Sequence, residues 1–519
     1  MSWVAPESTA GSPGADGPVV IRADAEVLVG TALTPSELLA HFGRKGIVYC
    51  HWKSNSHLAE GLEGLTDLDL LFDRTQIDII HATFSEAGFK RFVTDRSRFH
   101  PGTEDFLGVH PENGTLVHLH VHYEIHTGPR HLKNYRLPWA SRILSARVED
   151  PGSGVYTADP AHELLLLVVR AAMKVRARDR LKPILRVDPV PRELRVEFDW
   201  LITRTSIDVP VDLAEDLLGS HCSRLVASCL ESRLDFDDLV RLRSALKTRL
   251  GPYTTHGPLN AAVQRSGREL RWLAGSINRK WVKGPYRYAR TPASGGLLVA
   301  FVGSDGSGKS TAVKSLHRWL GGKVDVMPVY LGSGKGRGSL LRWPLQQMKK
   351  VVRRSGRRAE SGTNKPERSI AADRVIWALA LAREKRRKLR RAGRAREKGL
   401  IVVCDRYPQT QTAGVIDGPL LSSWLGSETT IRRLLAEWER RPYTLAGALG
   451  PDVVIRFDVP AELARSRRVD VDAETFVRRR EVVMDLRFPD ARYGLVSIDG
   501  DRDLDSVLLD VKQTIWSLV

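Results

Sequence analysis

The sequence predicts an α/β protein of two or three domains. The chain has 519 residues, which exceeds the length at which one hydrophobic core usually stops growing. From residue 297 onward, apolar strands alternate with helical stretches, which is typical of a parallel sheet covered by helices. The first half instead mixes short strands with turns and then becomes helical, which indicates an α+β domain followed by a helical region.

The composition is that of a folded protein without a membrane span. Hydrophobic residues make up 42% and charged residues 27% of the chain, which is ordinary for a globular domain. No apolar run approaches the roughly 20 residues that a membrane helix needs. The first residues carry neither a basic start nor an apolar stretch, so no secretory signal is expected. We therefore expect a cytoplasmic protein.

The order of these patterns sets the predicted domain limits. A stretch rich in glycine, proline and small residues separates the two halves and is the expected linker. The predicted parts are a flexible tail over 1–20, an α+β domain over 21–157, a helical domain or extension over 158–283, the linker over 284–296 and the α/β domain over 297–519.

The strongest local pattern is a glycine-rich loop directly after the first strand of the last domain. It reads Gly303-x-x-x-x-Gly308-Lys309-Ser310 and precedes a helical stretch. Glycines let such a loop bring backbone N–H groups close to phosphate oxygens, and the helix start adds partial positive charge. The lysine reaches the β- and γ-phosphates, and the serine hydroxyl is a ligand for Mg²⁺. This P-loop predicts a phosphate site that uses ATP and Mg²⁺.

A second pattern suits the first. A buried strand ends at Asp405, and Arg406 follows at once. A carboxylate at the end of such a strand can hold Mg²⁺ or its water, and an arginine beside it can stabilise phosphate charge. The alternative is a structural ion pair between Asp405 and Arg406.

These residues resemble the thymidylate kinase family of P-loop nucleotide kinases. The match consists of the loop at 303–310 and the Asp-Arg-Tyr sequence at 405–407. The segment 451–460 is similar to the strand before the lid of that family, and 478–493, with Arg487 and Tyr493, resembles its C-terminal helix. The resemblance covers about 296–519 and implies a P-loop phosphotransferase.

The resemblance also implies a set of site residues. Lys309, Asp405 and Arg406 would be catalytic, and Ser310 and Asp405 would hold the metal. The lid would span 465–480, where several arginines can offset triphosphate charge. The expected nucleotide ligands are Gly303, Ser304, Asp305, Gly306, Ser307, Gly308, Lys309, Ser310, Thr311, Arg467 and Arg468.

One segment departs from the family pattern. After Asp-Arg-Tyr the family usually carries a serine and then an Ala-Tyr-Gln run that meets the acceptor base, whereas this chain has PQTQTAG over 408–414. The expected partners are therefore a nucleotide and a small phosphorylated acceptor, without support for thymidylate in particular. The family also suggests a homodimer.

A basic insert lies between the P-loop helix and the strand that ends at Asp405. Residues 331–399 contain 22 Lys and Arg against 5 Asp and Glu, or 22 − 5 = +17 of the net charge of +19. Part of it, 340–354, mixes apolar and basic residues and is suited to an anionic membrane surface, while the basic helix over 380–398 is also suited to nucleic acid or an acidic glycan. Few aromatic residues interleave the charges, which argues against a platform for single-stranded nucleic acid. The alternative is a solvated helix without a partner, or a basic flank whose field attracts anionic substrates.

The N-terminal domain carries two carboxylates that are candidate metal ligands. Asp67 and Asp69 stand two apart on a predicted strand, so both point to one face. Such a pair can hold Mg²⁺ for nucleotidyl transfer. With a Lys-Ser-Asn turn at 53–55, the pattern resembles the nucleotidyltransferase superfamily over roughly 25–124, although Ser-Asn replaces the usual Gly-Ser or Gly-Gly.

The third carboxylate of that superfamily is missing from its expected strand. That strand, 117–125, places His118, His120, His122 and Glu124 on one face, with His120 where the acid would stand. Three interpretations follow. The histidines complete a metal site for zinc, manganese or iron, the domain is a non-catalytic binding module, or the strand is half-exposed and has no site.

Three functions are compatible with these patterns. The first is a thymidylate-kinase-like phosphotransferase with an additional nucleotidyltransferase activity. The second is an ATP-binding regulatory or scaffold protein at a membrane surface or in polysaccharide assembly. The third is an enzyme that processes nucleic-acid ends.

Overall fold

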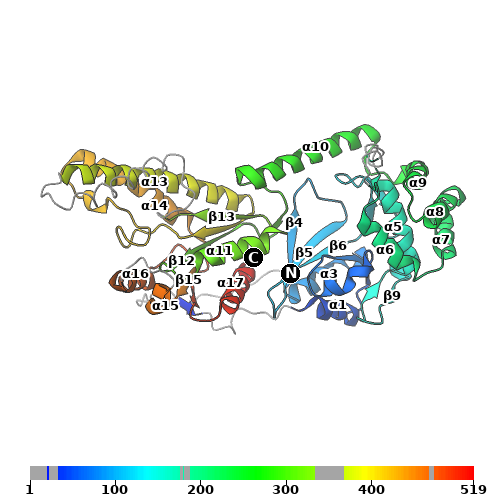
Figure 1. Cartoon of the computed structure of the whole chain (residues 1–519), viewed down its shortest axis with the longest axis horizontal. Helices are drawn as coiled ribbons and strands as arrows, with labels where there is room; N and C mark the ends of the chain where they lie inside the picture. The colour runs from blue at the N-terminus through cyan, green and yellow to red at the C-terminus, as the bar shows by residue number, and fades with distance from the viewer. Residues whose placement is uncertain (1–19, 23–32, 176–178, 180–187, 333–366, 467–472) are drawn as a thin grey trace, which may run out of the picture.

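The computed structural model describes residues 20–22, 33–175, 179, 188–332, 367–466 and 473–519. Figure 1 shows an elongated molecule with two lobes, each built around one large sheet, and with the C-terminus near their junction. No helix in these described ranges is both long enough and apolar enough to cross a membrane.

The C-terminal lobe contains a six-stranded sheet in which every neighbouring pair of strands is parallel. This confirms the predicted parallel sheet. In spatial order the strands are β1 (Val20–Arg22), β16 (Leu495–Asp499), β15 (Val453–Asp458), β12 (Leu297–Val302), β14 (Ile401–Asp405) and β13 (Val326–Tyr330).

Helices cover both faces of this sheet because the side chains of its strands alternate between two apolar cores. From β12, Leu297, Val299 and Phe301 join the core under α11 (Lys309–Gly321) and α17 (Leu504–Leu518). The intervening residues Leu298 and Ala300 face α13 (Glu367–Glu397) and α14 (Thr430–Leu449). Because both faces are apolar, β12 is a continuous hydrophobic run in the sequence.

The N-terminal lobe contains a mixed eight-stranded sheet. Most of its neighbours are antiparallel, but β3 and β6 are parallel and lie at its centre. In spatial order its strands are β11 (Arg290–Pro292), β4 (Lys90–Thr94), β5 (Thr103–Val109), β6 (Leu116–His122), β3 (Leu68–Phe72), β2 (Tyr49–His51), β10 (Tyr156–Thr157) and β9 (Val148–Glu149). Around it lie α1 (Pro35–Arg44), α2 (Leu58–Leu62), α3 (Ile77–Glu86), α4 (Ala140–Ser145) and the small hairpin of β7 (Ile125–Thr127) and β8 (Tyr135–Leu137).

A helical region follows this sheet. Its central helix is α5 (Pro160–Lys174), which is capped by Asp159 and is buried along nearly its whole length. Around it pack α6 (Arg192–Ile202), α7 (Asp208–Leu218), α8 (Ser220–Glu231) and α9 (Phe236–Arg249). The next helix, α10 (Pro258–Ile277), runs along one edge of the molecule from this bundle toward the C-terminal lobe (Figure 1).

Two strands cross the limits expected from the sequence. β1 stands before the N-terminal lobe in the chain but pairs with β16 at the edge of the C-terminal sheet. β11 lies inside the expected linker and pairs antiparallel with β4 of the N-terminal sheet. The segment 284–296 is therefore more than a connector, because its backbone completes the edge of a sheet.

The two lobes share an apolar core. Phe92 of β4 stacks on Trp516 of α17, with ring centroids 5.9 Å apart. Lys90 Nζ donates a hydrogen bond to the carbonyl of Ser517 at 3.2 Å. Lys323, just beyond α11, forms a 3.0 Å ion pair with Asp67. Burial of an aromatic pair together with polar contacts indicates that the lobes pack as one body.

The basic insert falls partly outside the described residues. The segment 340–354, with the membrane hypothesis that rests on it, lies in the undescribed range 333–366. The basic helix at 380–398 belongs to α13 and is packed on one face, while Arg387, Arg390 and Arg394 are exposed, so the alternative of a solvated basic face stays a prediction. Leu389, Ala392 and Ala395 are buried against the sheet, and Lys385 is 1% exposed.

The C-terminal end of the family pattern also differs from the expectation. The segment 478–493 is not one helix, because α16 (Ala473–Asp485) ends before Arg487 and Tyr493. The last helix is α17, which follows β16 and packs against α11 and the shared core of the two lobes.

Candidate functional site

The glycine-rich loop lies between β12 and α11, as its sequence predicts. Gly306 and Gly308 have φ values of 85° and 91°, a region that favours glycine. At Gly306 a Cβ atom would also stand 2.6 Å from the carbonyl oxygen of Ala464. Glycine at this position is therefore required both by backbone conformation and by space.

Lys309 is the buried cation of this loop. It is 5% exposed, and its Nζ donates hydrogen bonds to the carbonyl of Gly303 at 2.8 Å and to Ser307 Oγ at 3.1 Å. Burial, followed by the positive charge of Arg406, lowers the pKa of Lys309 to about 8. At neutral pH the lysine is therefore still mostly charged, and an anion bound beside it would raise its pKa again.

Ser310 and Asp405 are brought together from the two sequence patterns. Ser310 Oγ donates a 2.7 Å hydrogen bond to Asp405 Oδ2. Asp405 is 7% exposed, and no described residue donates a hydrogen bond to its buried Oδ1 atom. A buried carboxylate oxygen without a partner fits a cation or its water. The two residues therefore fit the expected Mg²⁺ position.

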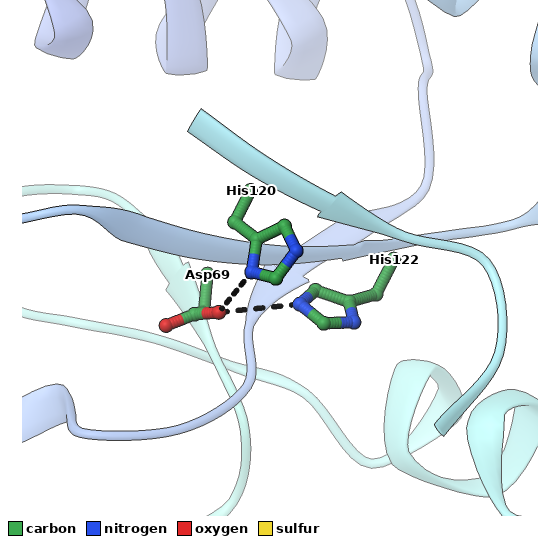
Figure 2. A group of neighbouring side chains, drawn as sticks. All are labelled: Asp69, His120 and His122. Carbon is green, nitrogen blue, oxygen red and sulfur yellow. Dashed lines mark hydrogen bonds and ion pairs between the residues drawn. The ribbon is translucent and has the colours of Figure 1, made fainter. Parts of the chain in front are cut away.

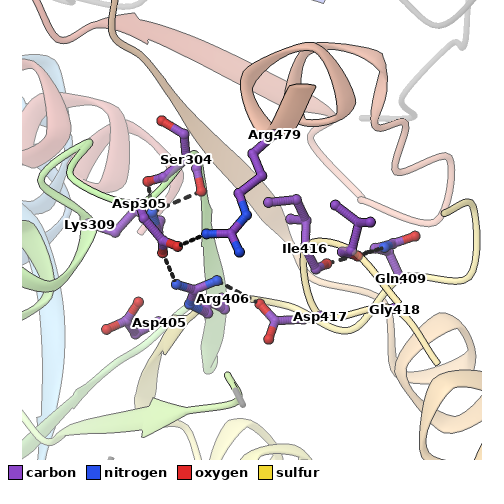
Figure 3. Close-up of polar contacts among 12 residues, drawn as sticks. Ser304, Asp305, Lys309, Asp405, Arg406, Gln409, Ile416, Asp417, Gly418 and Arg479 are labelled. Atoms are coloured by element: carbon purple, nitrogen blue, oxygen red, sulfur yellow. Dashed lines mark hydrogen bonds and ion pairs between the residues drawn. The ribbon is translucent and has the colours of Figure 1, made fainter. Parts of the chain in front are cut away.

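Arg406 is at the centre of an ion-pair network shown in Figure 3. Its guanidinium pairs with Asp305 of the loop and lies 3.2 Å from Asp417 Oδ2. Asp305 in turn accepts a 2.7 Å hydrogen bond from Arg479 of α16. Although burial raises the pKa of Asp305, the charge of Arg406 lowers it below its ordinary value. The alternative pair between Asp405 and Arg406 is wrong, since Arg406 pairs with Asp305 and Asp417 instead.

A cavity of about 460 Å³ opens beside the loop. The residues that line it include the loop and Arg406 on one side and apolar residues of α17 on the other. Such a cavity, apolar with a few convergent polar groups, is typical of a small-molecule site. Its lining is Asp305, Gly306, Ser307, Gly308, Lys309, Ser310, Thr311, Ala312, Arg406, Phe457, Gly500, Arg502, Leu504, Val507 and Leu508.

The segment that departs from the family forms a loop held by one glutamine. Gln409 Nε2 donates hydrogen bonds to the carbonyls of Thr412, Val415 and Ile416, at 2.8 to 3.1 Å. Its Oε1 atom accepts one from the Thr412 N–H at 2.8 Å. Ile416 and Asp417 both have positive φ values, which is rare for a β-branched residue. The loop holds Asp417 against Arg406, a role that no sequence signal indicated.

The lid prediction is covered only in part. Arg467 and Arg468 lie outside the described residues. Arg479 contacts Asp305 of the P-loop, while Arg480 donates a 2.8 Å hydrogen bond to Asp458 at the end of β15. The two adjacent arginines face different directions on the helix, and the sequence alone did not indicate which of them would contact the P-loop.

In the N-terminal lobe, Asp67 and Asp69 have separate partners. Asp67 pairs with Lys323 at 3.0 Å and lies 2.8 Å from His118. Asp69 pairs with Lys53 at 2.8 Å. Burial raises the pKa of both carboxyls, but the neighbouring histidines and lysines lower each of them below its ordinary value. The two carboxylates therefore have different partners, and the group of candidate metal ligands among the described residues contains Asp69 but not Asp67.

The histidine strand is buried, and it ends before Glu124. His118 and His122 are 1% and 2% exposed, so the interpretation as a half-exposed strand is wrong. β6 ends at His122, and Glu124 instead contacts Arg74 and His126.

The Lys-Ser-Asn turn at 53–55 donates hydrogen bonds to two carboxylates of the helical region. The N–H of Ser54 donates to Glu197 at 3.1 Å, and the N–H of Asn55 donates to Glu163 at 3.0 Å. Glu163 is 1% exposed, and burial raises its pKa to about 7. The backbone N–H groups of Ser54 and Asn55 therefore already donate hydrogen bonds within the chain.

Comparison with known proteins finds relatives but no matching family model. The chain is 32% identical to the "Uncharacterized ATP-binding protein YghR" of Escherichia coli (strain K12) over 184 residues, which is 34% of this chain and 70% of that protein. It is 28% identical to the "Uncharacterized ATP-binding protein YghS" of the same organism over 218 residues, 41% of this chain and 89% of that protein. It is 25% identical to the thymidylate kinase of Symbiobacterium thermophilum over 228 residues, 42% of this chain and 92% of that protein.

Two solved structures align with part of the chain. Thymidylate kinase from Ehrlichia chaffeensis aligns with 43% of this chain and 99% of its own, at 18% identity and a TM-score of 0.23. Deoxyadenosine kinase from M. mycoides with bound dATP aligns with 42% of this chain and 99% of its own, at 14% identity and a TM-score of 0.25.

Proposed function

The chain belongs to the family of the ATP-binding protein YghR of Escherichia coli, and we propose that it is an ATP- and Mg²⁺-dependent kinase. Its acceptor in this proposal is a small phosphorylated molecule of the nucleotide type. The observation that carries the proposal is the convergence of Lys309, Ser310 and Asp405 beside a cavity of about 460 Å³. The likeness to a thymidylate kinase supports the reaction class.

The roles of the donor residues follow from their present contacts. Lys309 donates to its own loop, so ATP phosphates that replace these carbonyls gain a buried, charge-assisted hydrogen bond. Ser310 Oγ and the unpartnered Oδ1 of Asp405 would hold Mg²⁺. When bound, Mg²⁺ offsets the charge of the phosphate oxygens. The apolar residues Leu504 and Leu508 would contact the base of the nucleotide.

The roles of the acceptor residues follow from the network around Asp305. Arg406 and Arg479 both bind its carboxylate and enter the space between the P-loop and the loop at 409–418 (Figure 3). In our proposal, acceptor and transferred phosphates compete with Asp305 for these guanidinium groups, which can bind phosphate through two parallel hydrogen bonds. Gln409 uses both of its polar atoms inside its loop, so we assign it no contact with the acceptor.

The first test is ATP consumption with Mg²⁺ against a panel of nucleoside monophosphates and phosphorylated sugars. We expect turnover with one class of acceptor, and a decrease of about a hundredfold or more in the Lys309→Ala variant, because a buried cation at the transferred phosphate is removed. Lys314→Ala is the matched control, since Lys314 lies exposed on the same helix α11.

Each outcome of this test is decisive for the kinase proposal. Equal turnover in the Lys309→Ala and Lys314→Ala variants would exclude the P-loop as the active site. Binding of ATP without turnover on any acceptor would favour the ATP-binding regulatory or scaffold protein instead.

The other functions expected from the sequence stay predictions. Asp67 and Asp69, the residues expected for nucleotidyl transfer, form ion pairs with different lysines. The membrane partner rests on a segment outside the described residues, and the glycan partner rests on the basic helix α13. The homodimer and the nucleic-acid function gain no support from the relatives named above.

A further inference from the structure

The N-terminal lobe brings three ligand atoms to one point, remote in sequence from the P-loop. The atoms are Asp69 Oδ1, His120 Nδ1 and His122 Nε2, which lie within 4.8 Å of one another. Both imidazole nitrogens stand 3.2 Å from the same carboxylate oxygen, as Figure 2 shows. Two histidines and one carboxylate around one point are a donor set typical of transition metals.

The fold fixes this arrangement through strand register. β3 and β6 pair in parallel with Asp69 opposite His120, and the two-residue period of β6 places His122 on the same face. Trp52 packs edge-on against the ring of His122, with centroids 5.1 Å apart. The ligands therefore stand on two central strands, which position side chains more precisely than loops do.

The two histidines differ in exposure in a way that suits an open metal site. His122 is 2% exposed, whereas His120 is half-buried and lines a cavity of about 220 Å³. A metal and its further ligands have an entry path through this cavity.

Lys53 now compensates the negative charge of Asp69, which a bound metal ion would compensate instead. Lys53 Nζ lies 2.8 Å from Asp69 Oδ1, the same oxygen that both histidines face. A second lysine, Lys133, lines the same cavity as His120. This surrounding opposes a weakly bound Mg²⁺, so only a cation that gains from imidazole nitrogen can displace Lys53.

We propose that Asp69, His120 and His122 bind a divalent transition metal ion, such as Zn²⁺, Mn²⁺ or Co²⁺, in preference to Mg²⁺. The site goes beyond the proposed kinase function, since it uses no residue of the P-loop. It also replaces the magnesium pair expected at Asp67 and Asp69, because Asp67 is held by His118 and Lys323 instead.

The test is metal binding by the full-length protein in the presence of excess Mg²⁺. We expect about one Co²⁺ or Zn²⁺ per chain, measured by equilibrium dialysis, with visible Co²⁺ absorption bands that indicate nitrogen ligands. The His120→Asn and Asp69→Asn variants should bind at least about a hundredfold more weakly. His118→Asn, on β6, and Asp67→Asn, directly before β3, are the matched controls and should retain the metal.

One further variant tests the competing cation. Lys53→Met removes the charge that now pairs with Asp69, so metal affinity should increase. The Lys309→Ala variant should bind the metal normally, which separates this site from the P-loop and from the outcome of the kinase assay.

Two results would overturn the proposal. The first is the absence of Co²⁺ and Zn²⁺ binding by the unmodified protein, a measurement that does not depend on whether a variant folds. The second is equal binding by the His120→Asn and His118→Asn variants.

Discussion

At the residue scale, Lys309 links burial to phosphate recognition. Its side chain is nearly inaccessible, and its Nζ atom donates to a carbonyl of its own loop. In our proposal, this hydrogen bond is exchanged for one to a phosphate oxygen when ATP binds. A buried ammonium has a lowered pKa, while adjacent phosphate charge raises it again. Binding of ATP and protonation of Lys309 are therefore coupled.

This coupling predicts that ATP binding weakens in alkaline solution. The pKa of Lys309 in the free protein is about 8, and it is higher in the complex. Below the lower value the lysine is charged in both states, so affinity is constant; above it, each pH unit should cost up to about tenfold in affinity until the higher value is passed. Calorimetric titration of an unhydrolysable ATP analogue from about pH 7.5 to about pH 9.5 measures this.

The control for this dependence is Lys309→Arg, because arginine keeps its charge throughout this range. Its affinity should change little with pH. An equal slope in the Lys309→Arg variant would assign the dependence to another group.

At the scale of elements, α13 is a basic helix with a structural interior. Lys385 lies buried on it, and its Nζ donates hydrogen bonds to the carbonyl of Asp417 at 2.9 Å and to the hydroxyl of Tyr443 at 3.2 Å. The helix thereby supports the loop that presents Asp417 to Arg406. Net charge alone suggested a partner-binding surface here, but part of the charge serves internal packing.

A substitution on α13 tests this support. Lys385→Met keeps most of the volume but removes the donor of two buried hydrogen bonds, so we expect a loss of about 2 kcal/mol in the free energy of unfolding. Arg387→Met removes one charge from an exposed position of the same helix and should change stability by less than about 0.5 kcal/mol. Urea unfolding of both variants measures the difference, and similar losses would contradict the structural role.

At the scale of the whole molecule, the two lobes are joined through α17. Trp516 is 6% exposed and stacks on Phe92 of the N-terminal sheet. Lys323, two residues past the P-loop helix, pairs with Asp67 at the start of β3. The P-loop and the histidine cluster are thus connected through packed elements rather than a flexible tether.

The shared core predicts that the lobes unfold together. Trp516→Ala should lower the free energy of unfolding by about 3–5 kcal/mol, because it leaves a large cavity in this core. Trp281→Ala is the control, since Trp281 is 73% exposed. Thermal unfolding of the Trp516→Ala variant should also separate into two transitions, and an unchanged single transition would contradict this account of the interface.

Some of the fold and site could be predicted because the information is local. Glycine spacing between a strand and a helix predicts the P-loop, since positive φ values at Gly306 and Gly308 are a property of a few adjacent residues. The alternation of apolar strands and helices likewise predicts the parallel sheet. The strand β11 within the segment 284–296 could not be predicted in this way, because its pairing with β4 depends on residues far away in the chain.

The sequence by itself therefore determined the phosphate-binding loop, the parallel sheet around it and the candidate ligands of both sites. Only the tertiary structure decided which ligands meet. It separated Asp67 from Asp69, joined Asp69 to His120 and His122, and placed Arg406 between Asp305 and Asp417. The physical reason is that such convergence depends on strand order, register and packing between distant segments, whereas a loop or a strand depends on the conformational preferences of neighbouring residues.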